Sequence, residues 1–337
     1  MKSISKSKTV VLLVNLGTPN QPTEEQVRIY LREFLSDKDV IRLPRIFWLP
    51  LLHLIILRTR PKKSAELYKK VWTEWGSPLL YNTFLQAGLL RKRLSDDFII
   101  DVAMRYGKPS IQGKMEEYYK LGFNHILFFP MFPQYSTTTT RSIANKISNV
   151  INKQKIFQNQ ESISMIKDFH DNESYINASV SHIKSFQNIH GMPEKLLLSF
   201  HGIPKSYVAE DEPYQNQCIK TAQLIADKLG IPKDKYEIVF QSRFGKAEWI
   251  QPYLAERLEK LPSEGIKNIQ VYCPGFSSDC LETIEEIGEE SHDLFMESGG
   301  TGYKFIPCLN GDSKFIDSLE SIIRNYKDKK MNFRDLL

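Results

Sequence analysis

Cysteine is scarce in this chain of 337 residues, and its spacing is not that of a cross-linked protein. Only four cysteines occur, at 218, 273, 280 and 308, and none belongs to a C-x-x-C pair. This usage indicates free thiols in a reducing compartment and argues against a disulfide framework. We therefore expect a cytoplasmic protein.

Two further features of common ligand-binding proteins are missing. The chain has no block of Lys and Arg, and its net charge of +5 is small for its length, so nucleic acid is not an expected partner. No G-x-G-x-x-G follows the first apolar run, because Gly17-Thr18-Pro19-Asn20 lacks the later glycines. A dinucleotide-dependent enzyme is disfavoured for that reason.

No apolar run is long enough to span about 30 Å of hydrocarbon. One short segment, Ile46–Leu57, is nevertheless almost wholly apolar, with Pro50 and His53 inside it. Basic residues flank it at Arg42, Arg45, Arg58, Arg60, Lys62 and Lys63. The segment is either a buried helix or a lip that lies against a membrane surface or closes over an apolar ligand.

Short apolar runs alternate with longer helical patterns, which predicts an α/β fold of parallel sheets flanked by helices. The predicted strands are Thr9–Leu16, Phe98–Met104, His125–Pro130, Lys195–Phe200, Tyr236–Gln241 and Asn268–Cys273. Helical patterns cover Glu24–Leu35, Leu79–Leu94, Gln215–Leu229 and Glu248–Leu261.

The chain also repeats three landmarks in the same order. Two apolar strands end in Gly-x-Pro, two later strands are followed by Arg-aromatic-Gly-Lys, and two Asn-led strands end in Pro-x-Phe. We expect two similar Rossmann-like domains, residues 1–165 and 166–337, with a C-terminal helix in the second and a cleft between them. Ligands of open α/β sheets bind beyond the carboxyl ends of the strands.

His201 stands at such an end, where the run LLLSF meets a Gly-Ile-Pro turn. By itself it could be a hydrogen-bonded core histidine. The matching place in the first half holds Leu16, followed by Gly17-Thr18-Pro19. Different side chains at equivalent backbone positions suggest that His201 carries chemistry and Leu16 lines an apolar surface.

Three glutamates, Glu282, Glu286 and Glu290, are spaced four apart on one side of a predicted helix. Asp279 and Glu282 have the spacing of a capping box, and acidic residues favour a helix N-terminus. Those effects explain the first turn and leave Glu290 unexplained. A path or binding site for cations is the alternative.

Several motifs together resemble the ferrochelatases, enzymes that insert ferrous iron into a porphyrin. They are VNLGTP, FPQYS, LLSFHGIPKSYVAEDEPY, QSRFG and SSDCLETIEE, and the similarity runs from Lys8 to beyond Leu309. It implies a chelatase-like fold and the synthesis of protoheme from protoporphyrin IX and Fe²⁺, the last step of heme biosynthesis. The alternatives are a chelatase for another ring, such as coproporphyrin, or another metal, and a porphyrin-binding protein without catalysis.

The resemblance also implies roles for individual residues. His201 and Glu282 would be the catalytic and metal-binding pair, and Glu286 and Glu290 a relay for cations or protons. Candidate porphyrin contacts are Leu16, Tyr106, Trp249, Arg58, Lys62, Arg105 and Ser136. The segment 46–57 would admit the porphyrin, in possible peripheral contact with the inner membrane.

The chain departs from the family pattern in three places. Asp211-Glu212-Pro213-Tyr214 replaces the frequent Gly-Asp-Pro-Tyr, and Cys280 stands where some relatives have a second histidine. We assign no role to Cys280. Some relatives hold an iron–sulfur cluster through cysteines of a C-terminal extension, and the residues 332–337 contain none. We expect no cluster and no permanently bound cofactor.

Overall fold

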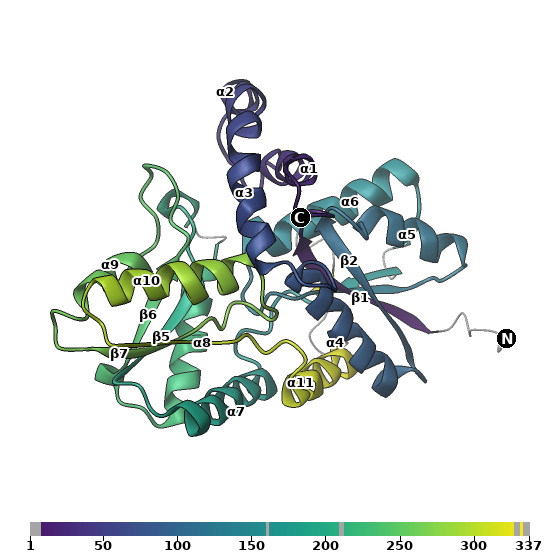
Figure 1. The fold of residues 1–337 in the computed structure, drawn as a ribbon. Coiled ribbons are helices and arrows are strands. Elements are labelled where there is room, and N and C mark those ends of the chain that lie inside the picture. The colour runs from purple at the N-terminus through teal and green to yellow at the C-terminus, as the bar shows by residue number, and fades with distance from the viewer. Residues whose placement is uncertain (1–7, 160–161, 209–211, 327–330, 333–337) are drawn as a thin grey trace. The chain divides into compact units, whose positions relative to one another are not determined.

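The computed structural model describes residues 8–159, 162–208, 212–326 and 331–332, which belong to two compact units (Figure 1). Unit 1 contains the chain up to Phe132, Ser136–Asp168 and the segment from Leu319 onward, and unit 2 contains Pro133–Tyr135 and Phe169–Ser318. Asp211, where the sequence departs from the family pattern, lies outside the described residues.

The C-terminal segment differs from the sequence-based division, which kept it with the second half. Its last strand, β9 (Met331–Asn332), pairs antiparallel with β4 (Ile163–Met165) of unit 1. Arg324, at the end of α11 (Ser313–Arg324), donates to Asp97 at 3.2 Å. These long-range contacts return the chain to unit 1, and no local pattern in the sequence encodes them.

Each unit is built on a parallel sheet whose first strand is central. In unit 1 the order is β2-β1-β3-β4-β9, and all pairs except the last are parallel. In unit 2 the order is β6-β5-β7-β8, and every pair is parallel. The other strands are β1 (Thr9–Gly17), β2 (Phe98–Tyr106), β3 (Ile126–Pro130), β5 (Lys195–His201), β6 (Tyr236–Gln241), β7 (Asn268–Tyr272) and β8 (Gly302–Ile306).

Helices connect the strands in both units (Figure 1). Those of unit 1 are α1 (Glu24–Leu35), α2 (Arg45–Leu51), the π-helix η1 (Leu52–Ile56), α3 (Leu57–Val71), α4 (Pro78–Leu94), α5 (Ile111–Lys120), the π-helix η2 (Thr137–Arg141) and α6 (Ser142–Gln154). Those of unit 2 are α7 (Glu173–His190), η4 (Lys205–Tyr207), α8 (Tyr214–Leu229), η5 (Lys233–Lys235), α9 (Leu254–Lys260), the π-helix η6 (Glu282–Glu290) and α10 (Ser291–Glu297).

The predicted internal repeat is confirmed by the matching strand order of the two sheets. It extends to an element that the sequence did not reveal, because a π-helix follows the third strand in each unit. The two π-helices differ in chemistry. The side chains of η2, with the sequence TTTTR, are mostly hydroxyl groups. Those of η6, with the sequence ETIEEIGEE, include five carboxylates.

Strand alternation sets the core of unit 2. Leu197 and Val271 belong to a buried cluster that includes residues of α9, η6 and α10, and the neighbouring Tyr272 points the other way, its hydroxyl 3.4 Å from Ser179 of α7. Helices therefore cover both faces of the sheet, and the open positions lie at the ends of the strands.

All six predicted strands are present, with ends shifted by at most two residues. The predicted helix over Glu248–Leu261 is wrong in its first turns, since α9 begins at Leu254. Trp249 there bridges to Pro204, and the N–H of Ile250 donates to Ile203 at 3.0 Å. Pro252, which has no N–H, separates this paired stretch from the helix.

Candidate active site

His201 is the last residue of β5, and two hydrogen bonds fix its place. The hydroxyl of Tyr214 donates to the carbonyl of His201 at 2.9 Å. The Nδ1 of His201 lies 2.6 Å from the carbonyl oxygen of Gly202, which can only accept, so Nδ1 carries the proton. In the neutral ring Nε2 is then left with a lone pair for a proton or a metal.

The turn after His201 requires glycine because of a close approach. A Cβ on Gly202 would lie 2.9 Å from the carbonyl oxygen of Gln241 and 3.1 Å from the ring of Trp249. The N–H of Gly202 donates to that same oxygen at 2.8 Å. The turn is thereby held against the end of β6, and the half-buried Trp249 packs beside the histidine turn.

The three glutamates lie on η6, which is a π-helix where the sequence predicted an α-helix. Glu282 and Glu286 are half-buried and Glu290 is exposed, so the acidic groups run from the interior to the surface of unit 2. π-helices are rare in proteins, and those that occur often lie at functional sites.

The expected capping box does not account for Asp279. Its carboxylate accepts from the side chain of Asn310 at 2.6 Å, from the N–H of Cys308 at 3.1 Å and from the hydroxyl of Thr283 at 3.0 Å. Asp279 therefore anchors the start of η6 to the loop after β8. The N–H of Asp279 donates to Asn310 at 2.8 Å, so it is not the partner of Glu282 that a capping box would require.

Glu286 is held by two hydrogen bonds from a single residue. Its two oxygens accept from Ser242, from the N–H at 2.7 Å and from the hydroxyl at 2.6 Å. Burial raises the pKa of Glu286, and the charge of Glu282 adds to this, whereas the Ser242 hydrogen bonds and the charge of His201 oppose it. The net effect is upward, so this carboxyl holds a proton more readily than an exposed glutamate.

His201 and the acids are brought together by the end of β6. In the sheet His201 lies opposite Gln241, whose amide donates to the carbonyl of Glu282 at 3.1 Å. Gln241 therefore links the strand that ends in His201 to the first residue of η6 within unit 2, and the pairing of His201 with Glu282 as catalytic groups stays a prediction. Such a set of groups can accept protons and bind a divalent cation.

Comparison with known proteins identifies the protein family of the chain. The family model described as Ferrochelatase matches residues 8–327. The chain belongs to the ferrochelatase family.

Similar proteins named ferrochelatase occur in several bacteria. Identity is 47% to the protein of Marinobacter nauticus, over 94% of this chain and 85% of the relative. It is 45% to that of Idiomarina loihiensis, over 94% and 88%, and 44% to that of Methylococcus capsulatus, over 95% and 97%. Iron insertion into protoporphyrin for heme synthesis, which the motifs predicted, is therefore the activity of this ferrochelatase.

The fold resembles that of other chelatases. SirB from Bacillus subtilis with Fe³⁺ superposes with a TM-score of 0.51 at 16% identity, over 74% of this chain and 91% of SirB. A cobalt complex of the sirohydrochlorin chelatase SirB gives the same TM-score at 14% identity, over 75% and 92%. The predicted chelatase-like fold is confirmed.

Two predicted porphyrin contacts of this ferrochelatase are engaged inside unit 1. Tyr106 is 1% exposed, and its hydroxyl donates to Asp37 at 2.7 Å. Arg105 pairs with Asp37 and donates to Ser142 at 2.8 Å. Burial would raise the pKa of Asp37, but Arg105 and the hydrogen bonds to Asp37 lower it overall. These contacts favour a structural role, and porphyrin contact stays a prediction for both.

The other predicted contacts occupy varied places. Leu16 is half-buried at the end of β1, and Arg58 and Lys62 are exposed on α3. Ser136 is buried and caps η2, where its hydroxyl accepts from the N–H of Thr138 at 3.2 Å. Each stays a prediction as a substrate contact.

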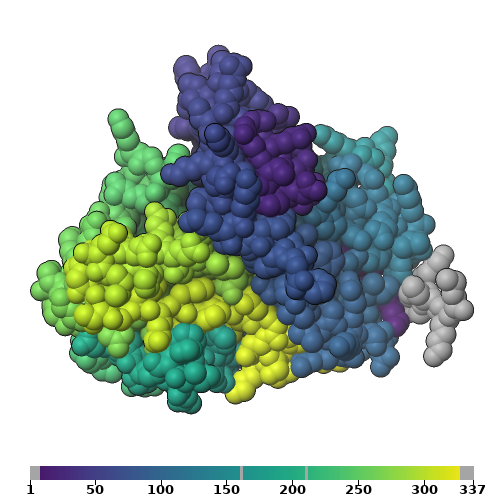
Figure 2. All heavy atoms as spheres, viewed as in Figure 1, coloured from purple at the N-terminus to yellow at the C-terminus, as the bar shows by residue number. Residues whose placement is uncertain are grey.

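The segment 46–57 forms α2, η1 and the first residue of α3, at the tip of a projecting arm of unit 1 (Figure 2). The segment is helical, but most of its apolar side chains are not buried, so the interpretation as a buried helix is wrong for them. Ile46 and Phe47 are 76% and 75% exposed, and Leu51, Leu54 and Ile55 are exposed beside them. Trp48 is buried at 7%, and its indole N–H donates to Leu35 at 2.7 Å.

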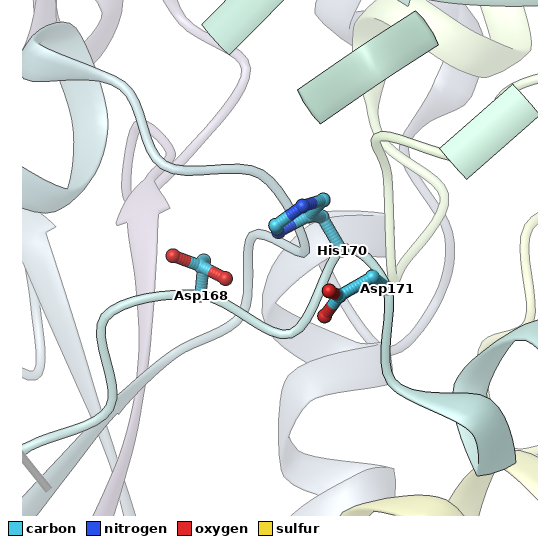
Figure 3. Close-up of side chains that lie close together, drawn as sticks. All are labelled: Asp168, His170 and Asp171. Atoms are coloured by element: carbon cyan, nitrogen blue, oxygen red, sulfur yellow. The ribbon is translucent and has the colours of Figure 1, made fainter. Parts of the chain in front are cut away.

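A second group of possible metal ligands lies on the loop after β4. Asp168, His170 and Asp171 each offer a ligand atom, and these atoms lie within 4.8 Å of one another (Figure 3). Exposed acidic groups often gather without a metal, so proximity alone does not make this loop a metal site.

Sequence reasoning assigned no role to three residues that touch the acids. Gln241 and Ser242 were visible only as part of a family motif, although they follow a predicted strand. Cys280 is buried, and burial followed by the nearby Glu282 carboxylate raises the pKa of its thiol. The signal that could have identified Gln241 and Ser242 is their position at the end of a predicted strand, in a half that also carries an acidic helix.

Proposed function

We propose that His201 and Glu282 perform the chemistry of iron insertion at the carboxyl edge of the unit 2 sheet. The observation that carries this is the hydrogen bond from His201 Nδ1 to Gly202, which leaves Nε2 as the basic atom. Insertion of Fe²⁺ displaces two protons from the pyrrole nitrogens, so the site needs a base near the ring centre.

His201 is suited to be that base. Metal-binding histidines commonly donate their other ring N–H to a carbonyl or carboxylate, which fixes the ring orientation and raises the basicity of the free nitrogen. Nε2 would accept a pyrrole proton or bind the incoming iron. Glu282 would complete the metal site or accept a proton, since carboxylate and imidazole both bind Fe(II).

Glu286 and Glu290 would serve as a relay between this centre and the surface. Glu290 is exposed, Glu286 is half-buried, and the pKa of Glu286 is raised mainly by burial. A carboxyl with a raised pKa takes up a proton at a higher pH than an exposed glutamate does, which suits it to pass protons on. Protons would leave, or cations enter, along this ridge.

The decisive experiment compares His201→Ala and Glu282→Gln with wild type. We expect each variant to lose about 10²- to 10⁴-fold in turnover, the usual contribution of a positioned acid or base. Insertion of Fe²⁺ or Zn²⁺ into protoporphyrin is followed by the change in porphyrin absorbance, and circular dichroism checks the fold. His190→Ala, at an exposed histidine of α7, is the matched control.

Near-wild-type turnover in a folded His201→Ala protein would remove the histidine from the mechanism. Near-wild-type turnover of Glu282→Gln would show that the Glu282 carboxylate is not needed to bind the metal or to accept a proton. Retained porphyrin binding without insertion, seen by fluorescence quenching, would separate catalysis from substrate binding.

Porphyrin contacts are proposed for a smaller group of side chains. Trp249 packs on the histidine turn, and its indole nitrogen is a buried donor with no hydrogen-bond partner in the part of the chain that the structure describes, so a polar group of the substrate could satisfy it. Leu16 occupies the equivalent strand end of unit 1. Arg58 and Lys62 carry exposed cations that could meet the propionates.

Peripheral contact with an anionic membrane surface is proposed for the arm that carries α2. Five apolar residues are exposed there, and Arg58 and Lys62 lie close by in sequence. Apolar side chains with basic neighbours bind the headgroup region of anionic bilayers. Among the described residues, no helix combines the length and apolar character needed to cross a bilayer.

Iron is proposed to enter as substrate, without a resident iron–sulfur cluster. All four cysteines are buried, and burial raises the pKa of each thiol, which disfavours the thiolate that a cluster needs. Nucleic acid is not a proposed partner, because the charge is small and dispersed.

A further inference from the structure

The end of β6 contacts two successive turns of η6. The amide nitrogen of Gln241 donates to the carbonyl of Glu282 at 3.1 Å and lies 3.5 Å from the Glu286 carboxylate. Ser242 donates both its N–H and its hydroxyl to Glu286, at 2.7 and 2.6 Å. One dipeptide thus contacts the backbone of one acid and the side chain of the next.

Gln241 is held from its other side as well. It is 2% exposed, and its amide oxygen accepts from the hydroxyl of Ser199 at 2.9 Å and from the thiol of Cys273 at 3.5 Å. Two donors on the oxygen side fix which end of the amide faces η6. Gln241 therefore ties β5 and the residue after β7 to the first turn of the acidic helix.

Ser242 has a backbone conformation that serine rarely adopts. Its φ of +66° lies in the left-handed region, which costs an L-residue energy. Such strain persists where the surroundings over-determine it, and it gathers at functional sites. Here the conformation is the one in which N–H and hydroxyl both reach the Glu286 carboxylate.

We propose that Gln241 and Ser242 are positioning residues that hold the Glu286 carboxylate in a single orientation on the His201 side of η6. This rests on the proposed relay role of Glu286. His201 lies opposite Gln241 in the sheet, and its ring when protonated acts electrostatically on Glu286, so a carboxylate held by the 241–242 pair stays within reach of the imidazole that receives a proton. A freely rotating carboxylate would exchange protons with the site less often.

The experiment is a double-mutant cycle between Ser242→Gly and Glu286→Gln, with Zn²⁺ insertion into protoporphyrin as the assay. Glycine accepts a φ of +66° and keeps the N–H, so Ser242→Gly removes only the hydroxyl and should fold. We expect kcat to fall about 10-fold with the KM for porphyrin unchanged, the lower end of the effect of losing a residue that orients a ligand. In the Glu286→Gln background the same change should have no further effect.

Gln241→Glu provides a second measurement. It retains the oxygen that accepts from Ser199 and loses the nitrogen that donates to η6, so kcat should fall by about 10- to 100-fold. Ser179→Ala is the matched control, because it removes a buried hydroxyl of unit 2 that contacts Tyr272 instead of the acidic helix. Its kcat and KM should equal those of wild type.

Four results would overturn the proposal. A raised KM for porphyrin with unchanged kcat would mean that Ser242 contacts the substrate itself. An equal loss from Ser242→Gly in both backgrounds would mean that it does not act through Glu286. Unchanged kcat in Ser242→Gly and Gln241→Glu, with a large loss in Glu286→Gln, would leave the relay intact and refute the positioning role. Wild-type kcat in Glu286→Gln would instead refute the relay itself, and the positioning role with it.

Discussion

At the scale of single residues, backbone geometry decides identities that look ordinary in the sequence. Gly17 and Gly202 both follow the last apolar residues of a central strand, in the repeated Gly-x-Pro turn. Gly202 is needed for its close approach to Gln241, and Gly17 for a similar approach together with a φ of +117°. The repeat in the sequence therefore encodes one steric solution, used once in each unit.

Replacing Gly17 by alanine should destabilise the protein strongly. A Cβ there would lie 1.9 Å from the carbonyl oxygen of Tyr106, a backbone atom that cannot move aside cheaply, and the positive φ adds strain. We expect a loss of about 2–4 kcal/mol in the free energy of unfolding, measured by urea denaturation.

Gly88→Ala is the matched control for that substitution. Gly88 lies within α4, and its added Cβ would meet no atom of the described residues within 4 Å. Alanine should raise the stability there by about 0.5–1 kcal/mol, because glycine is a poor helix former. Equal midpoints for the two variants would contradict the steric explanation.

At the scale of elements, the partly buried Glu286 of the π-helix η6 should lower the free energy of unfolding when it is ionised, and this effect should depend on pH. Its Glu286 has a raised pKa in the folded protein, first because of burial. A folded state that binds a proton more tightly than the unfolded chain loses stability as the pH rises through the interval between the two pKa values. The enzyme thus tolerates a destabilising charge in its acidic helix.

Glu286→Gln should remove that effect. We expect the variant to match wild type in stability at a pH below the ordinary glutamate range, and to exceed it increasingly as the pH rises through the interval between the unfolded-state and folded-state pKa values. Unfolding by urea at a series of pH values measures the difference. Parallel curves for the two proteins would show that Glu286 has the same pKa in the folded and unfolded states.

At the scale of the whole molecule, the exposed apolar face on the arm of unit 1 should govern membrane contact. Phe47→Glu should reduce the fraction bound to vesicles of anionic lipid by about 10-fold or more, since burying a phenylalanine contributes about 1.5–3 kcal/mol. Flotation of vesicles measures the bound fraction. Trp48 is unsuitable for this test, because it is buried and its replacement would disturb the packing.

Ile189→Glu serves as the control for an equally exposed apolar residue outside the arm. Ile189 is 78% exposed on α7 of unit 2. Its replacement should leave vesicle binding unchanged. Equal binding by wild type and Phe47→Glu would remove the membrane role from the arm.

The sequence by itself determined the α/β class, six of the strands, the internal repeat and the family. Each of these follows from local information, since apolar periodicity and turn residues act between near neighbours in the chain. The same information placed His201 at a strand end and the three glutamates on one helix. It could not give the helix type, because π- and α-helices place similar demands on side chains four apart.

Only the tertiary structure decided which groups meet. The return of the C-terminal segment to unit 1, the burial of Trp48 beside an exposed Phe47 and the capture of Asp279 by Asn310 all depend on partners distant in the chain. The contacts of Gln241 and Ser242 with the acidic helix do so as well. Such contacts arise when strands and helices pack, and the free energy that selects them belongs to the assembled core and its buried polar groups, which no single segment of sequence contains.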